Sequence, residues 1–336
     1  MNRMIQKLNA VKLVVVAVIL LSAFLVQNAN SQTLNSKKNF IKELTKQEGK
    51  GVLSGQFIRW SYNASLEEIE TIHKQSNQWV AILGIDYYAN FKDSIPAPGC
   101  NYYKVNEVVR SYFKTGGIVN ISCHFNNPQN GGSAWNTEIT FDSLFIEKSR
   151  VRQNYLSQLD CVAKGINDLL ENGTVVIFRP LHEMNGDWFW WCGQKRYKEL
   201  WQLTYHYLVH VKGITQLVWC YSPSASGDVI AYYPGNKYVD LVALDAYTSE
   251  LNREALIPYK ALIKLRKPFG FGEFGPYNGN AKVAADVKYD FKNFLTVLKN
   301  DFPKTVFFTT WRDHWGMANG IGVKELLNDN YIINKP

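Results

Sequence analysis

The amino-acid sequence predicts a (β/α)8 barrel, the α/β fold in which eight parallel strands alternate with helices. Two observations support this prediction: eight short apolar runs rich in β-branched and aromatic residues, and amphipathic stretches that separate most of these runs. The chain has 336 residues, and such a barrel takes about 250 residues, or more with insertions. We therefore expect residues 32–336 to form a single domain.

The expected strands are continuous apolar runs, which is typical of parallel strands that are buried on both faces. In chain order they are 51–57, 80–87, 118–124, 174–181, 216–221, 239–246, 268–274 and 305–311. The main rival fold is a doubly wound open sheet, which usually has a glycine fingerprint after its first strand. The first run, GVLSGQF, lacks that spacing.

Helices are expected where apolar residues recur every three, four or seven positions. The clearest case is 147–170, where Val151, Tyr155, Val162 and Ile166 share one face before the stop signal Asn172-Gly173. The other expected helices are 66–75, 105–114, 196–211, 254–265 and 283–298.

Polar and aromatic residues gather where the expected strands end, which is where barrels carry their function. They are His124, Asn126, Asn127, His182, Glu183, Asn185, Tyr221, Ser222, Asp245, Tyr247, Glu273, Trp311, Arg312 and Asp313. Some of them are expected to serve only as caps and turns.

Two of these residues are glutamates at strand ends. Glu183 lies in RPLHEMNGDWFWW (179–191), and Glu273 lies in PFGFGEFGP (268–276). They are 90 residues apart, or three strand-helix units of about 30 residues, so both are expected on the same rim. Gly272 and Gly275 allow a close approach to Glu273. Carboxyl groups beside flat aromatic rings suit a site that cleaves sugars.

These two motifs resemble those of glycoside hydrolase family 26, best known for β-mannanases. Further similar stretches are GVLSGQ (51–56), ISCHFNNP (121–128), VDLVALDAY (239–247) and TTWRDHW (309–315). The resemblance implies a (β/α)8 barrel and hydrolysis of mannan-type polysaccharides or oligosaccharides with retention of anomeric configuration. It implies that Glu183 is the general acid/base and Glu273 the nucleophile. It also implies that Tyr247 bonds the nucleophile, that His182 and Trp188 serve subsites −1 and +1, and that His124, Trp311 and Arg312 line the glycone side.

Retention requires two carboxyl groups about 5–5.5 Å apart and in opposite protonation states. We expect burial beside tryptophans and repulsion by Glu273 to raise the pKa of Glu183. Arg179, on the same strand as Glu183, could keep Glu273 ionised. The alternative for Arg179 is an ordinary ion pair in the barrel interior.

The remaining candidates have weaker signals. Asn185 and Trp191 lie in the Glu183 motif, and Trp190 alternates with Trp191, so one of these two is expected to pack inward. Trp135, in the loop NPQNGGSAW, is either an outer sugar platform or a loop anchor.

Several alternatives to a β-mannanase stay open from the sequence. Relatives with the same motifs could cleave β-glucan, mixed-linkage glucan or xylan, and a non-catalytic barrel could bind sugars without cleaving them. Endo and exo action are not distinguished. A loop at 91–103 could block one end of the cleft and favour release of short oligosaccharides.

The first 31 residues resemble an export signal, with a basic start, an apolar run at 13–26 and small residues near 29–31. The run is shorter than the roughly 20 residues that span a bilayer, although an uncleaved anchor is an alternative. We expect an exported, periplasmic or secreted monomer without a stable membrane anchor. Removal of the segment lowers the net charge from +8 to +5, and no basic block indicates nucleic-acid binding.

No cofactor or metal is expected. His206 and His210 are spaced as metal ligands on a helix, but no third ligand follows at a suitable distance. The five cysteines match no metal framework. In an exported chain one or two pairs could oxidise, whereas Cys123 and Cys220 lie in expected strands and could be core residues.

Overall fold

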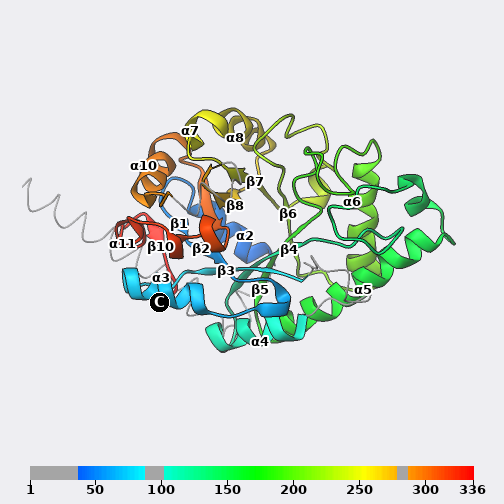
Figure 1. Ribbon diagram of the computed structural model, residues 1–336, viewed down its shortest axis with the longest axis horizontal. Coiled ribbons are helices and arrows are strands. Elements are labelled where there is room, and N and C mark those ends of the chain that lie inside the picture. The colour runs from blue at the N-terminus through cyan, green and yellow to red at the C-terminus, as the bar shows by residue number, and fades with distance from the viewer. Residues whose placement is uncertain (1–36, 88–101, 278–286) are drawn as a thin grey trace, which may run out of the picture.

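The computed structural model, which describes residues 37–87, 102–277 and 287–336, contains a closed barrel of parallel strands (Figure 1). From β2 to β8 each strand pairs with the next, and β9 pairs with β8 on one side and with β1 and β2 on the other, which closes the ring. The predicted fold is therefore confirmed.

The strands lie within one or two residues of the predicted runs. They are β1 Val52–Leu53, β2 Gly55–Phe57, β3 Ile82–Asp86, β4 Ile118–Cys123, β5 Val175–Pro180, β6 Val218–Tyr221, β7 Leu241–Tyr247, β8 Phe269–Gly275 and β9 Thr305–Thr310. The first predicted strand is divided in two at Ser54, whose hydroxyl accepts a hydrogen bond from the amide of Ala81. A further strand, β10 Ile332–Ile333, pairs with β1 and was not predicted.

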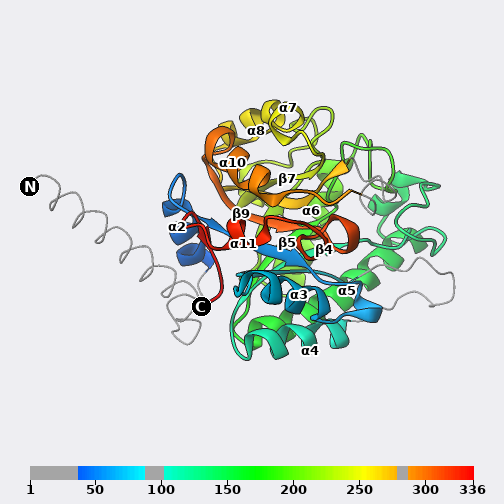
Figure 2. The same cartoon turned by 60° about the vertical axis from the view of Figure 1, so that its left-hand side comes forward.

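Helices surround the strands (Figures 1 and 2). The longer α-helices are α3 Glu67–Ser76, α4 Tyr102–Phe113, α5 Arg150–Glu171, α6 Tyr197–His206, α8 Leu256–Leu262 and α10 Phe291–Asp301. Two α-helices are shorter, α7 Leu251–Glu254 and α11 Val323–Leu327. The 3-10 helices are η2 Ser61–Asn63, η3 Phe141–Phe145, η5 Asn236–Tyr238, η6 Ile263–Leu265, η8 Asp313–Trp315 and η9 Met317–Asn319. Helix α5 begins where the Ser149 hydroxyl accepts a hydrogen bond from the amide of Arg152 at 3.1 Å.

Three predicted helices differ from the structure. The helix predicted at 196–211 continues past α6 as one π-helical turn, η4 Tyr207–Val211. The one predicted at 254–265 is divided among α7, α8 and η6. The one predicted at 283–298 begins only at Phe291, because Asp290 caps the helix through the Lys292 amide; residues 278–286 lie outside the described part.

The unpredicted helix α2, Lys37–Lys46, covers the amino end of the barrel. Its apolar residues Phe40 and Leu44 join a separate interior cluster with Ile177, Val218 and Ile333. This cluster fills the end of the barrel opposite the strand exits. Helix α2 therefore packs at the end of the barrel opposite the rim where the candidate residues lie.

None of the described helices is long and apolar enough to cross a bilayer. The expected export signal at 1–31 lies outside the described residues, as does most of the loop expected at 91–103, so both stay predictions. Cys123, Cys192 and Cys220 are buried free thiols, whereas Cys161 is disulfide-bonded. Cys123 and Cys220 are core residues, as one alternative predicted.

Candidate active site

Glu183 and Glu273 lie at the open rim and face the same cavity. Glu183 follows β5, the fourth position of the barrel, and Glu273 lies in β8, the seventh. Both are nearly buried, with 8% and 2% of their surface exposed, and both line a cavity of about 890 Å³. A volume of several hundred Å³ is typical of a small-molecule site.

The backbone around Glu183 has an unusual conformation. Leu181 and Glu183 have positive φ angles of 53° and 54°, which non-glycine residues adopt rarely and at a cost in free energy. Three hydrogen bonds hold these turns: the Glu183 amide donates to the Ser222 carbonyl, the Tyr197 hydroxyl to the Leu181 carbonyl, and the Trp191 indole to the His182 carbonyl, each at 2.8 Å. Tertiary contacts therefore fix the direction of the Glu183 side chain.

The surroundings of Glu183 favour its protonated form. Burial raises the pKa of Glu183 well above its ordinary value, and the charges of Glu273 and Asp245 raise it further. The Trp188 indole donates to Glu183 Oε2 at 2.7 Å and opposes this shift, as does the charge of Arg179. A carboxylic acid that keeps its proton near neutral pH is suited to general acid catalysis.

Glu273 accepts two strong hydrogen bonds. Arg179 Nη2 lies 2.6 Å from Glu273 Oε1, and the Tyr247 hydroxyl donates to Glu273 Oε2 at 2.7 Å. Arg179 is completely buried, so its charge acts on Glu273 with little screening by water. The two contacts hold both oxygens of the Glu273 carboxyl group in place.

Arg179 also joins Asp245 to the same network. Its Nη1 lies 2.7 and 2.8 Å from the two oxygens of Asp245, which also accepts a bond from the Ser222 hydroxyl at 2.6 Å. The remaining guanidinium donor, Nε, bonds the Asn120 side chain at 2.9 Å. Burial raises the pKa of Asp245 to about 8, with Glu273 adding to the shift and Arg179 opposing it.

Gly272 makes room for this network. A Cβ atom there would lie 2.5 Å from the Ser222 hydroxyl, 2.6 Å from Asp245 Oδ1 and 2.8 Å from Arg179 Nη1. At Gly275 a Cβ atom would lie 2.7 Å from the Tyr247 ring. The prediction that these two glycines permit close approach is confirmed, although the approaching groups belong mainly to neighbours of Glu273.

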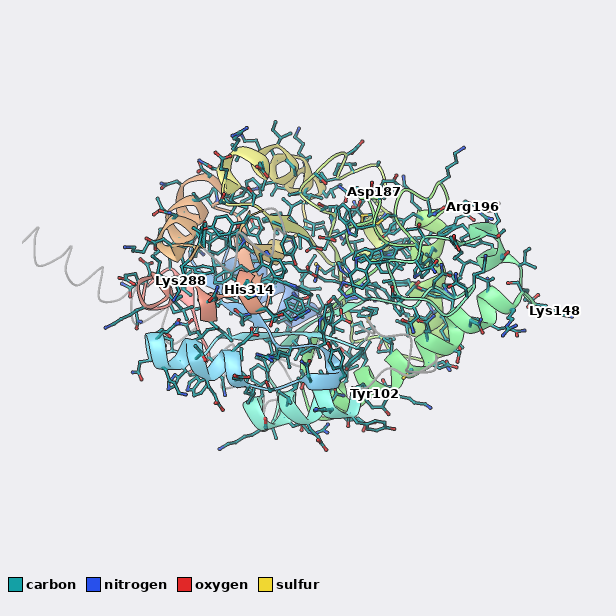
Figure 3. The ribbon with its side chains drawn as sticks, viewed as in Figure 1. Tyr102, Lys148, Asp187, Arg196, Lys288 and His314 are labelled. Carbon is teal, nitrogen blue, oxygen red and sulfur yellow. The ribbon has the colours of Figure 1, made fainter. Side chains whose placement is uncertain are left out.

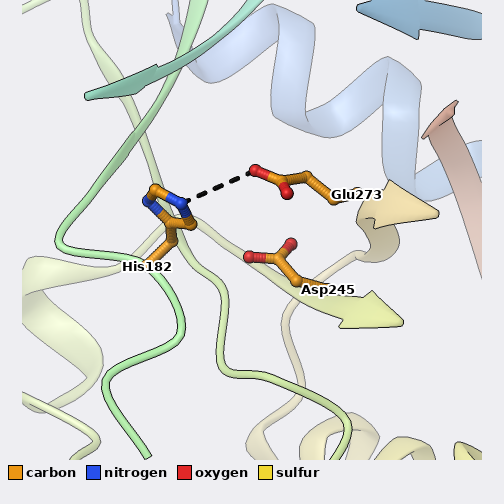
Figure 4. A group of neighbouring side chains, drawn as sticks. All are labelled: His182, Asp245 and Glu273. Atoms are coloured by element: carbon orange, nitrogen blue, oxygen red, sulfur yellow. Dashed lines mark ion pairs between the residues drawn. The ribbon is translucent and has the colours of Figure 1, made fainter. Parts of the chain in front are cut away.

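His182, Asp245 and Glu273 form the one group of three potential metal ligands found among the described residues, with ligand atoms within 4.8 Å of one another (Figure 4). Burial lowers the pKa of His182 well below its ordinary value, and the charges of His124 and Arg179 lower it further. The guanidinium of Arg179 already bonds both carboxylates and supplies the balancing positive charge. We therefore assign no metal to this group. The two histidines that are spaced as metal ligands in the sequence, His206 and His210, stack on each other, with ring centroids 5.1 Å apart.

One wall of the cavity is built around His124. Its Nδ1 lies 2.7 Å from Asp86 Oδ2, and the Ser122 hydroxyl donates to the same oxygen at 2.6 Å. The Trp135 ring stacks on the His124 ring at an interplanar angle of 11° and a centroid distance of 5.0 Å. Trp135 is 37% exposed and lines the cavity. Its ring therefore both fixes its loop against His124 and offers an exposed face to a sugar.

Trp60, Trp311 and Arg312 continue this wall, because the Trp60 ring meets the His124 ring edge to face at 5.2 Å. The Trp60 and Trp311 rings meet edge to face at 5.6 Å, and the Arg312 guanidinium lies 4.0 Å above the Trp60 ring. Arg312 also forms an ion pair with Asp313. All three residues line the cavity.

The residues of this chain match a family model described as Glycosyl hydrolase family 26, over positions 26–336. The chain belongs to glycosyl hydrolase family 26. The resemblance inferred from the sequence motifs is thus confirmed.

Individual relatives agree with this family assignment. A mannan endo-1,4-beta-mannosidase of Bacillus subtilis (strain 168) is 36% identical over 330 residues, which cover 92% of this chain and 87% of the relative. The mannan endo-1,4-beta-mannosidase A and B of Caldalkalibacillus mannanilyticus is 32% identical over 323 residues, covering 92% of this chain and 61% of the relative. The solved structure of Bacillus subtilis mannanase BCman superposes with a TM-score of 0.79 at 34% identity, over 90% of this chain and 93% of the other.

The predicted site residues of this family 26 protein fall into two groups. Those that line the cavity are His124, Trp135, Glu183, Trp188, Tyr247, Glu273, Trp311 and Arg312. Arg179, His182, Asn185 and Trp191 lie behind this surface. Asn185 joins two loops, because its side chain donates to the carbonyls of Ser224 and Ser226 and accepts from the Ser224 amide.

Two expectations for the tryptophan cluster need correction. Trp190 and Trp191 are both completely buried, whereas only one was expected to pack inward. The Trp190 indole donates to the Phe125 carbonyl at 2.8 Å, and the Trp191 ring stacks under Phe189 at 4.6 Å. Phe189, rather than Trp191, therefore faces the cavity.

Several cavity residues were not singled out from the sequence. They are Trp60, Phe189, Ser224, Ala225, Ser226, Thr248, Glu254 and Trp315. Trp60 follows the first barrel strand by three residues and Trp315 lies in the TTWRDHW stretch, so the rule that strand exits carry function would have found both. The serines are brought to the cavity by the Asn185 contacts, which leave no mark in the local sequence.

Proposed function

We propose that this protein is a retaining β-mannanase that hydrolyses β-1,4-mannosidic bonds in mannan-type polysaccharides or oligosaccharides. The observation that carries the proposal is the contrast between two carboxyl groups in one cavity. Burial and neighbouring charge raise the pKa of Glu183, whereas the Arg179 guanidinium and the Tyr247 hydroxyl donate directly to the two oxygens of Glu273. Double displacement requires this division of roles.

In the first step Glu273 attacks the anomeric carbon while Glu183 gives its proton to the departing glycosidic oxygen. The bond between the anomeric carbon and that oxygen breaks, and an ester between the sugar and Glu273 forms. Tyr247 and Arg179 hold the attacking carboxylate in place and limit its rotation.

In the second step Glu183, now ionised, takes a proton from water, and the resulting nucleophile attacks the anomeric carbon. The ester bond breaks, Glu273 leaves as a carboxylate, and the sugar departs with its original configuration after two inversions. The pKa of Glu183 is highest when Glu273 is charged, and esterification of Glu273 removes that charge. The same residue is therefore a better acid in the first step and a better base in the second.

The aromatic side chains provide the sugar-binding surfaces. Six aromatic residues line the same cavity as the carboxyl pair: Trp60, Trp135, Trp188, Phe189, Trp311 and Trp315. Flat rings bury the apolar faces of pyranoses with few rotatable bonds to fix. The names of the relatives, mannan endo-1,4-beta-mannosidases, support mannan as the polysaccharide and internal bonds as the point of cleavage. Export to the periplasm or the medium is part of the proposal, since a polysaccharide is met outside the cytoplasm.

A reducing-sugar assay on glucomannan, galactomannan, lichenan and xylan tests the proposal. Cleavage of the mannans with little release from lichenan and xylan is expected. Glu183→Ala should lower turnover about 10²-fold to 10⁴-fold, the usual contribution of a positioned acid or base. Glu273→Ala removes the nucleophile and should lower turnover at least as much. Azide should restore turnover of Glu273→Ala and give a glycosyl azide of inverted configuration.

Three results would contradict the proposal. Wild-type turnover in both variants would remove the catalytic assignment. Cleavage of lichenan or xylan in preference to mannan would move the enzyme to another polysaccharide. Binding of mannan without new reducing ends would indicate a sugar-binding protein.

A further inference from the structure

A buried carboxylate, that of Asp86, lies behind the ring of His124, which lines the catalytic cavity. Asp86 is the last residue of β3 and stands in register with Ser122 of β4. His124 directly follows β4, and side chains two residues apart on an extended chain point to the same face. Ser122 and His124 therefore both lie beside Asp86. The three side chains are at most 4% exposed.

Asp86 accepts hydrogen bonds from both of these neighbours. The Ser122 hydroxyl donates to Asp86 Oδ2 at 2.6 Å, and the backbone amide of His124 donates to Oδ1 at 3.3 Å. The Nδ1 atom of His124 lies 2.7 Å from Oδ2. An ionised aspartate accepts hydrogen bonds but has no hydrogen to donate, so the hydrogen in this contact belongs to Nδ1. The carboxylate thus decides which ring nitrogen carries a hydrogen.

Aromatic rings hold His124 in one orientation. Trp135 stacks on one face of the ring at 5.0 Å, and the rings of Phe189 and His182 meet it edge to face at 5.2 and 4.8 Å. A ring enclosed in this way cannot turn without displacing its neighbours. Within the part of the chain that the structure describes, no residue forms a hydrogen bond with His124 Nε2. Because Nδ1 faces Asp86, Nε2 is the ring nitrogen that remains for a molecule in the cavity.

His124 also lies close to the proposed nucleophile. The ring of His182 is 4.8 Å from that of His124, and His182 Nε2 is 3.6 Å from Glu273 Oε1 (Figure 4). A sugar that is esterified to Glu273 would therefore lie beside His124. Hydrogen bonds to the hydroxyl groups of that sugar strengthen as its ring gains positive charge in the transition state. An acceptor at this position then stabilises the transition state more than the ground state.

We propose that Asp86 is a positioning residue that keeps a hydrogen on His124 Nδ1, so that the lone pair of Nε2 accepts a hydrogen bond from a hydroxyl group of the sugar at Glu273. Asp86 does not line the cavity and acts only through His124. The inference rests on the proposed mannanase function. A purely structural role of Asp86 would not depend on which nitrogen of His124 carries the hydrogen, and this difference can be measured.

Nitrogen-15 NMR of the protein labelled in its histidines measures the position of the hydrogen directly. The chain has six histidines, and the spectrum of His124→Ala assigns the signals of His124 by their loss. At the pH of the activity assay, the wild type should show a protonated Nδ1 and an unprotonated Nε2 at His124. A hydrogen on Nε2 overturns the proposal, and this measurement does not require a variant of Asp86 to fold.

Asp86→Asn should reverse the arrangement. The backbone amide of His124 can only donate, so the asparagine oxygen should turn toward it and the NH2 group toward Nδ1. Nδ1 then has to accept, and the hydrogen moves to Nε2, which the same NMR experiment detects. The value of kcat/KM on a soluble mannan should fall about tenfold, mainly through kcat, which is the effect of losing one ordinary hydrogen bond in the transition state.

The matched control is Asp142→Asn. Asp142 pairs with Arg196, which is labelled in Figure 3, and 75% of the Asp142 side chain is exposed. This variant makes the same chemical change at the surface and should retain the wild-type kcat/KM and the wild-type NMR signals of His124.

A double-mutant cycle separates positioning from structural support. If Asp86 acts through His124, Asp86→Asn should lower kcat/KM no further in the His124→Ala background. An equal loss in both backgrounds overturns the proposal, as does a wild-type kcat/KM in Asp86→Asn. If the wild type cleaves no mannan, the proposed function fails, whereas the position of the hydrogen still decides whether Asp86 controls His124.

Discussion

The guanidinium of Arg179 lies 2.6 Å from the carboxylate of Glu273 in the buried centre of the barrel rim. Neither side chain is appreciably exposed, and the same guanidinium also bonds Asp245 and Asn120. The three guanidinium nitrogens, which lie in one plane, are thus distributed over four partners, the fourth being the Ser222 hydroxyl. Lysine has the same charge but cannot occupy this arrangement, because its ammonium is a compact point donor.

Arg179→Lys should therefore lower kcat about a hundredfold, or about 2.7 kcal/mol of transition-state stabilisation. A buried ion pair that loses one partner typically costs about 3–5 kcal/mol, so the midpoint of thermal unfolding should also fall. The control is Arg110→Lys, since Arg110 pairs with Asp168 at a half-exposed position. Wild-type kcat in Arg179→Lys would support the alternative that Arg179 is only a structural ion pair.

Tyr247→Phe removes the hydroxyl that donates to Glu273 Oε2 at 2.7 Å and leaves the ring in place. The hydrogen bond orients the nucleophile rather than the substrate, so kcat should fall about 10-fold to 100-fold with a smaller change in KM. Steady-state kinetics on a soluble mannan measure both parameters. Tyr233→Phe, which loses a hydroxyl bonded to Asn236 at the surface, should retain wild-type values. A rise in KM at constant kcat would instead assign Tyr247 to substrate binding.

Trp188→Phe removes the indole that donates to Glu183 Oε2. This hydrogen bond stabilises the ionised form and lowers the pKa of Glu183, so its loss should raise that pKa further. Glu183 must be protonated to act as an acid, and activity declines at high pH as it ionises. The basic limb of the profile of kcat/KM against pH should therefore move to higher pH in the variant. A shift to lower pH would contradict the role of Glu183 as the acid.

Glu68 provides a prediction for stability. Burial, with a smaller contribution from Asp313, raises the pKa of Glu68 from 4.5 to about 7. An acid with a raised pKa stabilises the fold most below its unfolded pKa, and this contribution disappears as the pH rises through about 7. Between pH 4 and pH 8 the wild type should lose on the order of 3 kcal/mol of unfolding free energy relative to Glu68→Gln.

Urea unfolding at both pH values measures this difference. Glu67→Gln is the control, because the Glu67 side chain is 70% exposed and its ionisation should affect the unfolding free energy little. Parallel pH dependence in the wild type and Glu68→Gln would show that Glu68 does not titrate in this range.

The barrel could be predicted from the sequence because each strand that is buried on both faces leaves a continuous apolar run. The two glutamates could be placed on one rim for the same reason, since a parallel barrel brings all strand exits to one end. Strand β10 could not be predicted, because Ile332 and Ile333 are too short a run to show a period and pair only through tertiary contact with β1. Ser54 interrupts the first strand through contacts with Ala81 and Asn334 that are distant in sequence.

The site was predictable where a residue carries the chemistry itself and less so where it supports another residue. Glu183, Glu273 and Tyr247 lie within recognisable motifs, whereas Gln56 fixes the turn after β9 from the opposite end of the chain. The tryptophans show the same limit. Trp188, Trp190 and Trp191 are close neighbours in the sequence, yet only Trp188 of these three lines the cavity. The backbone before them turns at Leu181 and Glu183 through positive φ angles, and the spacing of residues does not reveal such turns.

The pairing of β10 with β1 has a consequence for the order of folding. The first strand of the barrel receives its outer neighbour from residues 332 and 333, so this pairing forms only after the whole segment between the two strands has been synthesised. Ile333 also belongs to the cluster under α2, and the bottom of the barrel stays unsealed until the same moment. Contacts between residues so distant in sequence form slowly, because the entropy of closing a long loop must be overcome before they add stability.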